Sequence, residues 1–232
     1  MVKTNIIESL FFNILIASFL LPALGILFNY KNLKTEKVFI VLFIYCIGFM
    51  TMLYFDDFLS KYRHAYTTFY TTIEYLVFSY TLWFFIQSKK LKKVIVILSV
   101  TFLLFQATHY FIGDFSILDT IPIGVETILI FLQIFFLFYE QFQKATEHFY
   151  ITPSFWIVLG LMIYLSGSFF FNILANNVDI RKTIIKYWFF TYIFEIIKNI
   201  FFLIAIVIYA KKNKKNRLQR KTSIPYLDID LT

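Results

Sequence analysis

The chain has 232 residues, of which 59% are hydrophobic and only 16% are charged, and its mean hydropathy is +0.72. These values lie outside the range of ordinary soluble domains and predict a protein whose solvent is the lipid bilayer. A helix that spans a bilayer needs about 20 mostly apolar residues, so about seven spans would use nearly the whole chain. We therefore expect no separate soluble catalytic domain.

The formal net charge of +8 is compatible with binding to nucleic acid or to an anionic membrane surface. The basic residues lie in short loops and in a tail beside hydrophobic runs, which favours the membrane surface, so we expect no nucleic-acid partner. Cys46 is the only cysteine, which excludes an internal disulfide and a cysteine-based metal site. His64 and His148 have no partners at ligand spacing, and we expect no metal site.

Apolar runs bounded by charged residues follow one another along the chain. They cover approximately residues 6–28, 37–55, 66–87, 94–112, 121–140, 153–175 and 184–210. Only an α-helix satisfies every backbone polar group within such a run, because the strands of a membrane barrel would show alternating segments of about ten residues. We predict an all-α polytopic integral membrane protein, with a bundle of about seven transmembrane helices in a domain of residues 1–210 and a basic cytoplasmic tail of residues 211–232.

The first apolar run follows Lys3 in the manner of a signal peptide. It is longer than a usual signal-peptide core, and no clear small-residue cleavage site ends it, so we interpret it as the first span. Pro22 lies inside this run and Gly25 follows one turn later. A proline in a helix interior removes a backbone hydrogen bond, which predicts a kink in this span.

The basic residues indicate how the helices are oriented. One side of the predicted bundle has Lys31, Lys34, Lys37, Lys89, Lys90, Lys92, Lys93, Lys144, Lys211, Lys212, Lys214, Lys215, Arg217, Arg220 and Lys221. The other side has only Lys3, Lys61, Arg63, Arg181, Lys182 and Lys186. The positive-inside rule then predicts that the N-terminus lies outside and the C-terminus lies in the cytoplasm of a cell inner (plasma) membrane.

The tail begins as a basic cluster and ends in alternating apolar and acidic residues at 224–231. The basic part is typical of an anchor beside anionic lipid. The last residues either form a disordered terminus or add as a strand to a cytoplasmic or membrane signalling partner.

Ionisable side chains inside spans are costly and normally face the bundle interior. Glu74 and Glu126 lie roughly 12 Å and 8 Å below the outer ends of their spans, at about 1.5 Å per residue. Glu195, Lys198 and Asn199 share one face of the seventh span. The other polar residues that we place in the outer half are Asn13, Gln106, His109 and Asn172, and the inner half has little beyond Gln133.

This distribution has two interpretations. The polar residues either line a pocket that opens outward, or form interhelical hydrogen bonds that hold the bundle together. Glu195 and Lys198 alone would form a structural ion pair, which leaves Glu74 and Glu126 without a cation. Those two carboxyl groups would then hold protons or bind a cationic ligand.

Three segments carry a resemblance to a known group of proteins: Thr72-Ile73-Glu74-Tyr75, Glu126-Thr127-Ile128-Leu129-Ile130 and Ile196-Ile197-Lys198-Asn199-Ile200. With these segments the chain resembles small uncharacterised seven-helix integral membrane proteins of Bacteroidota. The resemblance implies the architecture and no activity.

The lysine of the last span, with an acid one turn before it and an acid in the third span, is also similar to the pattern of microbial rhodopsins. That resemblance would imply retinal on Lys198, with acids as counter-ions. Glu195 precedes the lysine by three positions where the rhodopsin pattern has four, and the sixth span lacks the aromatic and proline signature. We therefore expect no retinal and no other cofactor.

The sequence has no nucleophile–base pair, HExxH motif, Walker loop or glycine-rich dinucleotide turn, so we expect no enzymatic activity. The leading hypothesis is a receptor-like or sensory-accessory membrane protein that has an outward-facing polar pocket and signals through a partner. The alternatives are a small transporter or proton-coupled permease that uses the intramembrane Glu and Lys residues, and a structural membrane scaffold.

Overall fold

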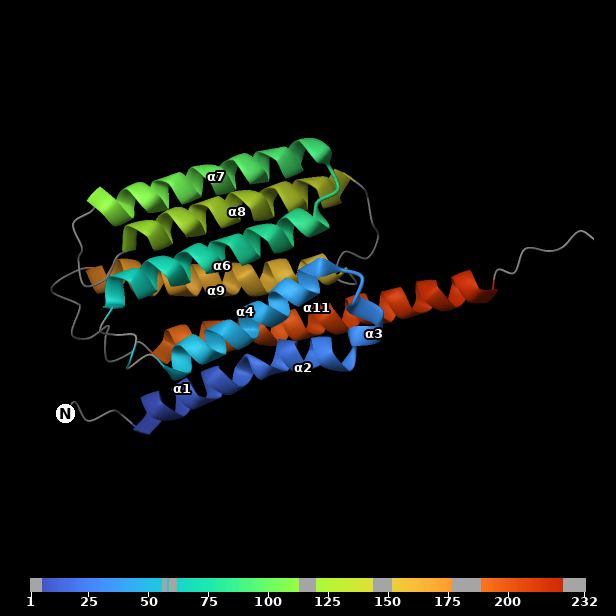
Figure 1. Ribbon diagram of the computed structural model, residues 1–232, viewed down its shortest axis with the longest axis horizontal. Helices are drawn as coiled ribbons and strands as arrows, with labels where there is room; N and C mark the ends of the chain where they lie inside the picture. Colours follow the sequence, from blue (N-terminus) through green and yellow to red (C-terminus); the bar gives the residue numbers. More distant parts are fainter. Residues whose placement is uncertain are drawn as a thin grey trace, which may run out of the picture.

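The computed structural model describes residues 6–55, 58, 62–112, 120–143, 152–176 and 189–222. Within these ranges every regular element is a helix and none is a strand (Figure 1). The helices are α1 (Ile6–Ser18), α2 (Leu20–Phe28), α3 (Tyr30–Leu33), α4 (Lys37–Tyr54), α6 (Arg63–Phe85), α7 (Lys89–Ile112), α8 (Thr120–Gln143), α9 (Pro153–Asn176) and α11 (Phe189–Thr222).

Among the described residues, six helical segments are long and apolar enough to cross a membrane. They are Glu8–Phe28, Lys37–Tyr54, Lys89–Ile112, Ile121–Gln143, Pro153–Ile173 and Phe189–Gln219. The prediction of an all-helical fold is therefore confirmed for the described residues, and the six apolar helices are compatible with a multi-pass membrane protein. The sequence analysis expected about seven spans, and the difference is α6, whose first half is rich in threonine, tyrosine and histidine.

Helix α6 nevertheless lies inside the bundle and packs against α4, α7 and α8. Its buried side chains include the polar Thr71, Glu74, Ser79 and Thr81. A helix that turns polar side chains toward other helices needs fewer apolar residues than a helix that faces lipid. This inward polar face is why the composition of α6 differs from that of the other long helices.

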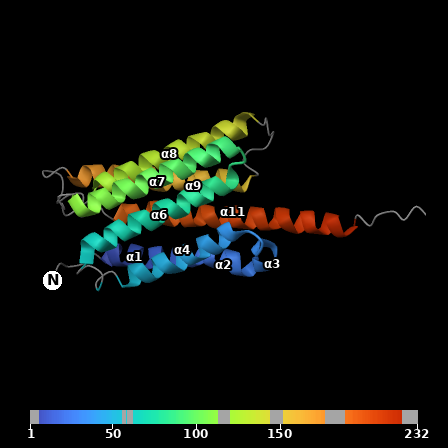
Figure 2. The same cartoon turned by 45° about the horizontal axis from the view of Figure 1, so that its top comes forward.

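The long helices lie side by side in a bundle in which α6, α9 and α11 separate α1, α2 and α4 on one side from α7 and α8 on the other (Figures 1 and 2). Helix α11 packs against α9, α1, α2 and α3. Its C-terminal part continues beyond the end of the other helices (Figure 2). Residues 211–222 of the predicted tail therefore form a helical extension of α11, whereas the predicted alternating segment at 224–231 lies outside the described residues.

The first apolar run forms two helices, α1 and α2, which meet at Phe19. Pro22 has no N–H group to donate to the carbonyl of Ser18, so the backbone ladder is interrupted at this point. The Ser18 hydroxyl instead donates a hydrogen bond to the Leu15 carbonyl at 2.7 Å. The helix is thus interrupted one turn before the proline, while the backbone of Phe19 keeps helical angles (φ −64°, ψ −23°), so the kink stays a prediction.

Helices α9 and α11 approach each other closely through glycines. A Cβ atom added at Gly167 would collide with the ring of Phe194, and one added at Gly160 would lie 3.0 Å from the Cβ of Phe201. Small residues allow backbones to approach in this way in membrane bundles. Gly167 therefore has a packing role between α9 and α11.

Replacing Gly167 by alanine tests this contact. We expect Gly167→Ala to lower the thermal unfolding midpoint in detergent, because overpacking typically costs about 1–3 kcal/mol. Gly48→Ala is the matched control, since a Cβ atom there meets nothing within 4 Å. The control should keep or slightly raise the midpoint, because alanine favours a helix over glycine by about 1 kcal/mol. Equal midpoints for the two variants would contradict the close packing of α9 on α11.

Candidate functional site

Lys198 of α11 is fully buried, with an exposed fraction of 0%. Its Nζ atom lies 3.2 Å from Oε1 of Glu195, one turn earlier on the same helix, and 3.8 Å from Oε1 of Glu74 on α6. It also donates a hydrogen bond of 2.9 Å to the hydroxyl of Tyr45 on α4. A single ammonium group thus links α4, α6 and α11.

Both oxygens of the Glu74 carboxylate accept hydrogen bonds from tyrosines. The Tyr45 hydroxyl donates to Oε1 at 3.1 Å, and the Tyr164 hydroxyl of α9 donates to Oε2 at 3.0 Å. Hydrogen bonds to a charged acceptor are stronger than those between neutral groups. Tyr45, Glu74, Tyr164, Glu195 and Lys198 are called the Lys198 network below.

Aromatic rings surround the Lys198 ammonium group. Its Nζ atom lies 4.1 Å from the ring centroid of Tyr164, 5.3 Å from that of Phe78, 5.4 Å from that of Tyr45 and 5.5 Å from that of Phe19. Such distances allow cation–π attraction, which is stronger where water is excluded. The rings also keep the ion pairs in a medium of low dielectric constant.

Asn199 connects the network region to the break in the first span. It is fully buried, and its Nδ2 atom donates a hydrogen bond of 2.8 Å to the Ser18 hydroxyl. Its Oδ1 atom has no hydrogen-bond partner among the described residues. The α1–α2 junction and the charged face of α11 are therefore held together by a polar contact.

Glu126 of α8 is 2% exposed, and its Oε1 atom has no hydrogen-bond partner among the described residues. Its carboxyl group interacts electrostatically with Glu74 and Lys198. Among the described residues, the buried charged side chains are the carboxyl groups of Glu74, Glu126, Glu140 and Glu195 and the ammonium group of Lys198. An uncompensated charge at membrane depth is costly, so protons or a bound cation must supply the remaining positive charge.

The structure brings together some of the predicted site residues and separates others. Glu74, which the sequence left without a cation, pairs with Lys198, and the expected contact of Lys198 with Glu195 is present. Gln106 of α7 donates a weak hydrogen bond of 3.4 Å to the Thr68 carbonyl on α6, and its Oε1 atom has no partner in the described part of the chain. The site therefore centres on α11 and α6.

The remaining predicted residues have contacts elsewhere. Asn172 donates to the carbonyl and the hydroxyl of Ser168 at 2.8 Å and 3.3 Å, within α9 itself. His109 packs beside Phe105, with 5.8 Å between ring centroids. These contacts lie within single helices and add no link to the Lys198 network.

Buried polar groups extend further along the bundle than the residues singled out from the sequence. Glu74 lies near the middle of α6, and Tyr164 lies near the middle of α9. At the opposite end, the buried Glu140 accepts hydrogen bonds from the backbone N–H groups of Gln87 at 2.9 Å and Ser88 at 3.4 Å. Glu140 thereby pairs with backbone N–H groups just before the first turn of α7. The position of Glu140 at the end of an apolar run does not reveal this local role.

The sequence analysis also missed Tyr45, Tyr164 and Ser18. Tyrosines are enriched at membrane interfaces, where their rings and hydroxyl groups suit lipid and water. Tyr45 and Tyr164 instead lie near the centres of their helices, where a hydroxyl group needs a partner. The feature of the sequence that could have identified them is their position in the middle of an apolar run.

Comparisons with protein-family models, curated proteins and solved structures find no match to this chain. Inferences about the site therefore rest on its geometry and charge.

Removal of the Lys198 ammonium group alone should destabilise the fold more than removal of this group together with its carboxylate partners. We expect Lys198→Met to lower the free energy of unfolding by about 3–5 kcal/mol, because buried carboxylates lose their partner. Lys198→Met with Glu195→Gln should recover part of this loss, and adding Glu74→Gln should recover more.

Unfolding in detergent measures these differences, and Lys215→Met is the control because Lys215 is exposed on the same helix. A change within about 0.5 kcal/mol is expected for the control. If the single and the multiple variants were equally destabilised, the ion pairs would not be coupled in the way that the distances indicate.

Proposed function

We propose that this chain is a receptor-like or sensory-accessory protein of the cell inner membrane, in which the Lys198 network responds to a small cationic ligand that enters from the outer side. The observation that carries the proposal is the continuity of α11. This helix carries Glu195, Lys198 and Asn199 and runs without interruption to Thr222. A displacement of the buried charges would therefore move the basic extension as well.

The proposal takes α6 as a seventh transmembrane helix. Its 23 residues are long enough for the purpose, since at 1.5 Å per residue they extend about 34 Å and the hydrocarbon core is about 30 Å thick. Its position among α4, α7 and α8 supports the same assignment. An odd number of spans puts the termini on opposite sides of the membrane.

The proposed orientation has the N-terminus outside and the C-terminus in the cytoplasm. The basic residues of α3, the lysines that begin α7 and the extension of α11 lie at the same end of the bundle (Figure 1). An excess of lysine and arginine marks the cytoplasmic side. The end at which α1 and α6 begin is then the outer end.

The charge balance favours a cation as the ligand. Glu126 is a buried carboxyl group that lacks a hydrogen bond at Oε1 and interacts electrostatically with Glu74. A cation at Glu126 would offset negative charge and would change the balance between Glu74 and Lys198. A ligand shifts a conformational equilibrium only through such a difference in interaction between two states. Movement of α11 is the change that would follow.

A transporter or proton-coupled permease that uses Glu74, Glu126, Glu195 and Lys198 is the second candidate. The interruption of the backbone hydrogen-bond ladder by Pro22 favours it, because discontinuous helices line the substrate sites of many transporters. The contact of Ser18 with Asn199 puts this break beside the charged face of α11. A transporter would need access to the network from both sides of the membrane.

Native mass spectrometry of the full chain in lipid nanodiscs tests the proposed ligand. We expect a small cationic molecule to be retained by the wild type and lost from Glu126→Gln and from the Glu195→Gln/Lys198→Met double variant. Glu8→Gln on α1 is the control, since it makes the same chemical change outside the network. Retention by the control is expected.

The loss reports on binding only if the variant stays folded. The thermal unfolding midpoint of Glu126→Gln should therefore equal that of the wild type. If Glu126→Gln kept the molecule as well as the wild type does, the site would lie elsewhere. If the wild type carried no molecule, the network would serve only to hold the helices together, and the scaffold hypothesis would be favoured.

A further inference from the structure

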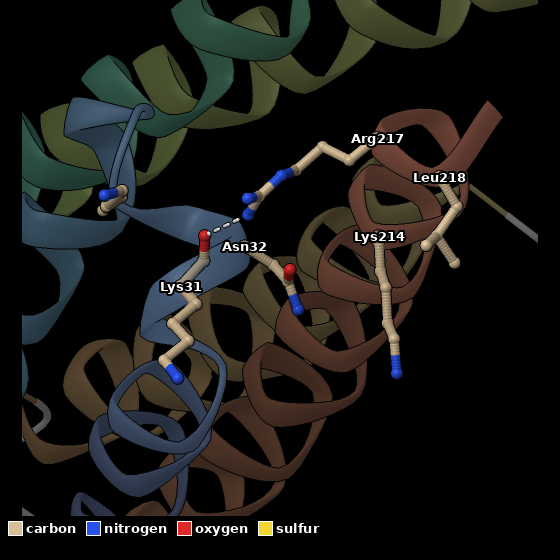
Figure 3. A pocket seen from close by; sticks show the side chains of 6 residues that line it. Lys31, Asn32, Lys214, Arg217 and Leu218 are labelled. Atoms are coloured by element: carbon tan, nitrogen blue, oxygen red, sulfur yellow. Dashed lines mark hydrogen bonds between the residues drawn. The ribbon is translucent and has the colours of Figure 1, made fainter. Parts of the chain in front are cut away.

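A second polar site lies where α3 meets the extension of α11. A pocket with a volume of about 390 Å³ is lined by Lys31, Asn32, Lys34, Lys214, Arg217 and Leu218 (Figure 3). Four of these side chains carry a positive charge, and none of the lining residues is acidic. The two contributing segments are far apart in the sequence, so the pocket exists only in the folded chain.

Hydrogen bonds hold the two segments in place. Arg217 Nη1 donates to the Lys31 carbonyl at 2.8 Å, and Asn213 Nδ2 donates to the Asn32 carbonyl at 3.2 Å. These bonds tie the α11 extension to the carbonyl groups of α3. The pocket is therefore part of the packed structure.

The side chains are arranged around a common space. In Figure 3 the side chains of Lys31 and Lys214 extend toward the same side, and the amide of Asn32 lies between them. Arg217 reaches across from α11 to α3. Like charges that line one pocket repel each other, and a bound anion would reduce this repulsion.

The position of the pocket relative to apolar surface indicates the source of the anion. Phe28, at the end of α2, is 85% exposed, and Tyr30, the first residue of α3, is 54% exposed. On the α11 side of the pocket, Leu218 is 56% exposed. Basic residues beside exposed apolar and aromatic residues are typical of the level of lipid headgroups. Phosphate groups of phospholipids lie at that level.

We propose that this pocket binds the phosphate group of an anionic phospholipid. The phosphate accepts hydrogen bonds from Lys31 and Lys214, Asn32 adds an amide donor, and the lipid tails lie against the exposed residues at the end of α2. A bound lipid would also hold the α11 extension against α3. This inference is independent of the ligand of the Lys198 network.

Lipid retention by the full chain tests the pocket. The wild type and Lys31→Gln/Lys214→Gln are each placed in nanodiscs that contain equal amounts of phosphatidylglycerol and phosphatidylcholine. Native mass spectrometry then measures which lipid each protein retains. We expect the wild type to retain phosphatidylglycerol preferentially. The double variant should bind it roughly 25-fold more weakly, given the contribution of each basic residue near a membrane surface.

The matched control is Lys211→Gln/Lys215→Gln, which removes the same charge from the same extension but from residues that do not line the pocket. It should retain the lipid nearly as the wild type does. Equal loss in both double variants would overturn the proposal, because the attraction would then come from general surface charge. Retention of phosphatidylglycerol by both would overturn it as well.

Titration with inorganic phosphate distinguishes a lipid from a free anion. We expect millimolar inorganic phosphate to leave the bound phosphatidylglycerol in place, because the lipid tails contribute to binding. Complete displacement would assign the pocket to a soluble phosphate group and overturn the lipid assignment. The thermal midpoint in lipid-free detergent checks folding: it should be equal or higher in Lys31→Gln/Lys214→Gln, because the repulsion between the lysines is removed.

Discussion

The structure depends on one physical constraint, which is that a fully buried ammonium group inside an apolar bundle must have partners. Lys198 meets this constraint with Glu195 on its own helix, with Glu74 on α6 and with the hydroxyl of Tyr45 on α4. Tyr164 then completes the hydrogen bonds of Glu74 from α9. The charge therefore specifies which faces of four helices meet.

Helix α11 connects the main features of the molecule. Its glycine-mediated contact with α9, its bond from Asn199 to Ser18 and its two hydrogen bonds to α3 all lie along one continuous helix. A displacement at the middle of this helix would therefore also displace its C-terminal extension. This continuity is the physical reason for preferring a receptor-like function over a scaffold, since a scaffold needs no such route.

Much of the helical architecture could be predicted, because apolar runs and basic turns depend on local sequence. The pairing of Glu195 with Lys198 could be predicted for the same reason, since residues three apart share a helix face. Helix α6 is not among the six described helices that are apolar enough to cross a membrane, and several of its polar residues are turned into the bundle.

The rest of the site could not be predicted from one sequence. The approach of Glu74 to Lys198 joins residues on different helices, and helix rotation decides which side chains meet. Tyr45 and Tyr164 were missed because mid-helix tyrosines look like ordinary apolar residues in a hydropathy profile. The basic pocket was visible only as charge in two separate segments, and the hydrogen bonds of Arg217 and Asn213 are what join them.

Cysteine labelling shows from which side of the membrane the region of the Lys198 network is reached. Ser18→Cys is made in a Cys46→Ala chain, which has no other cysteine, and the protein in oriented vesicles is treated with a membrane-impermeant thiol reagent. Tyr54→Cys and Lys215→Cys serve as reference positions for the two sides.

We predict that Ser18→Cys reacts with reagent added on the Tyr54 side and not on the Lys215 side. The reaction should be slower than at Tyr54→Cys, because Ser18 is 4% exposed and Tyr54 is 74% exposed. Reaction from the Lys215 side would contradict one-sided access and favour a transporter. Failure to react from either side would contradict a ligand-accessible site and leave the Lys198 network as a structural ion pair.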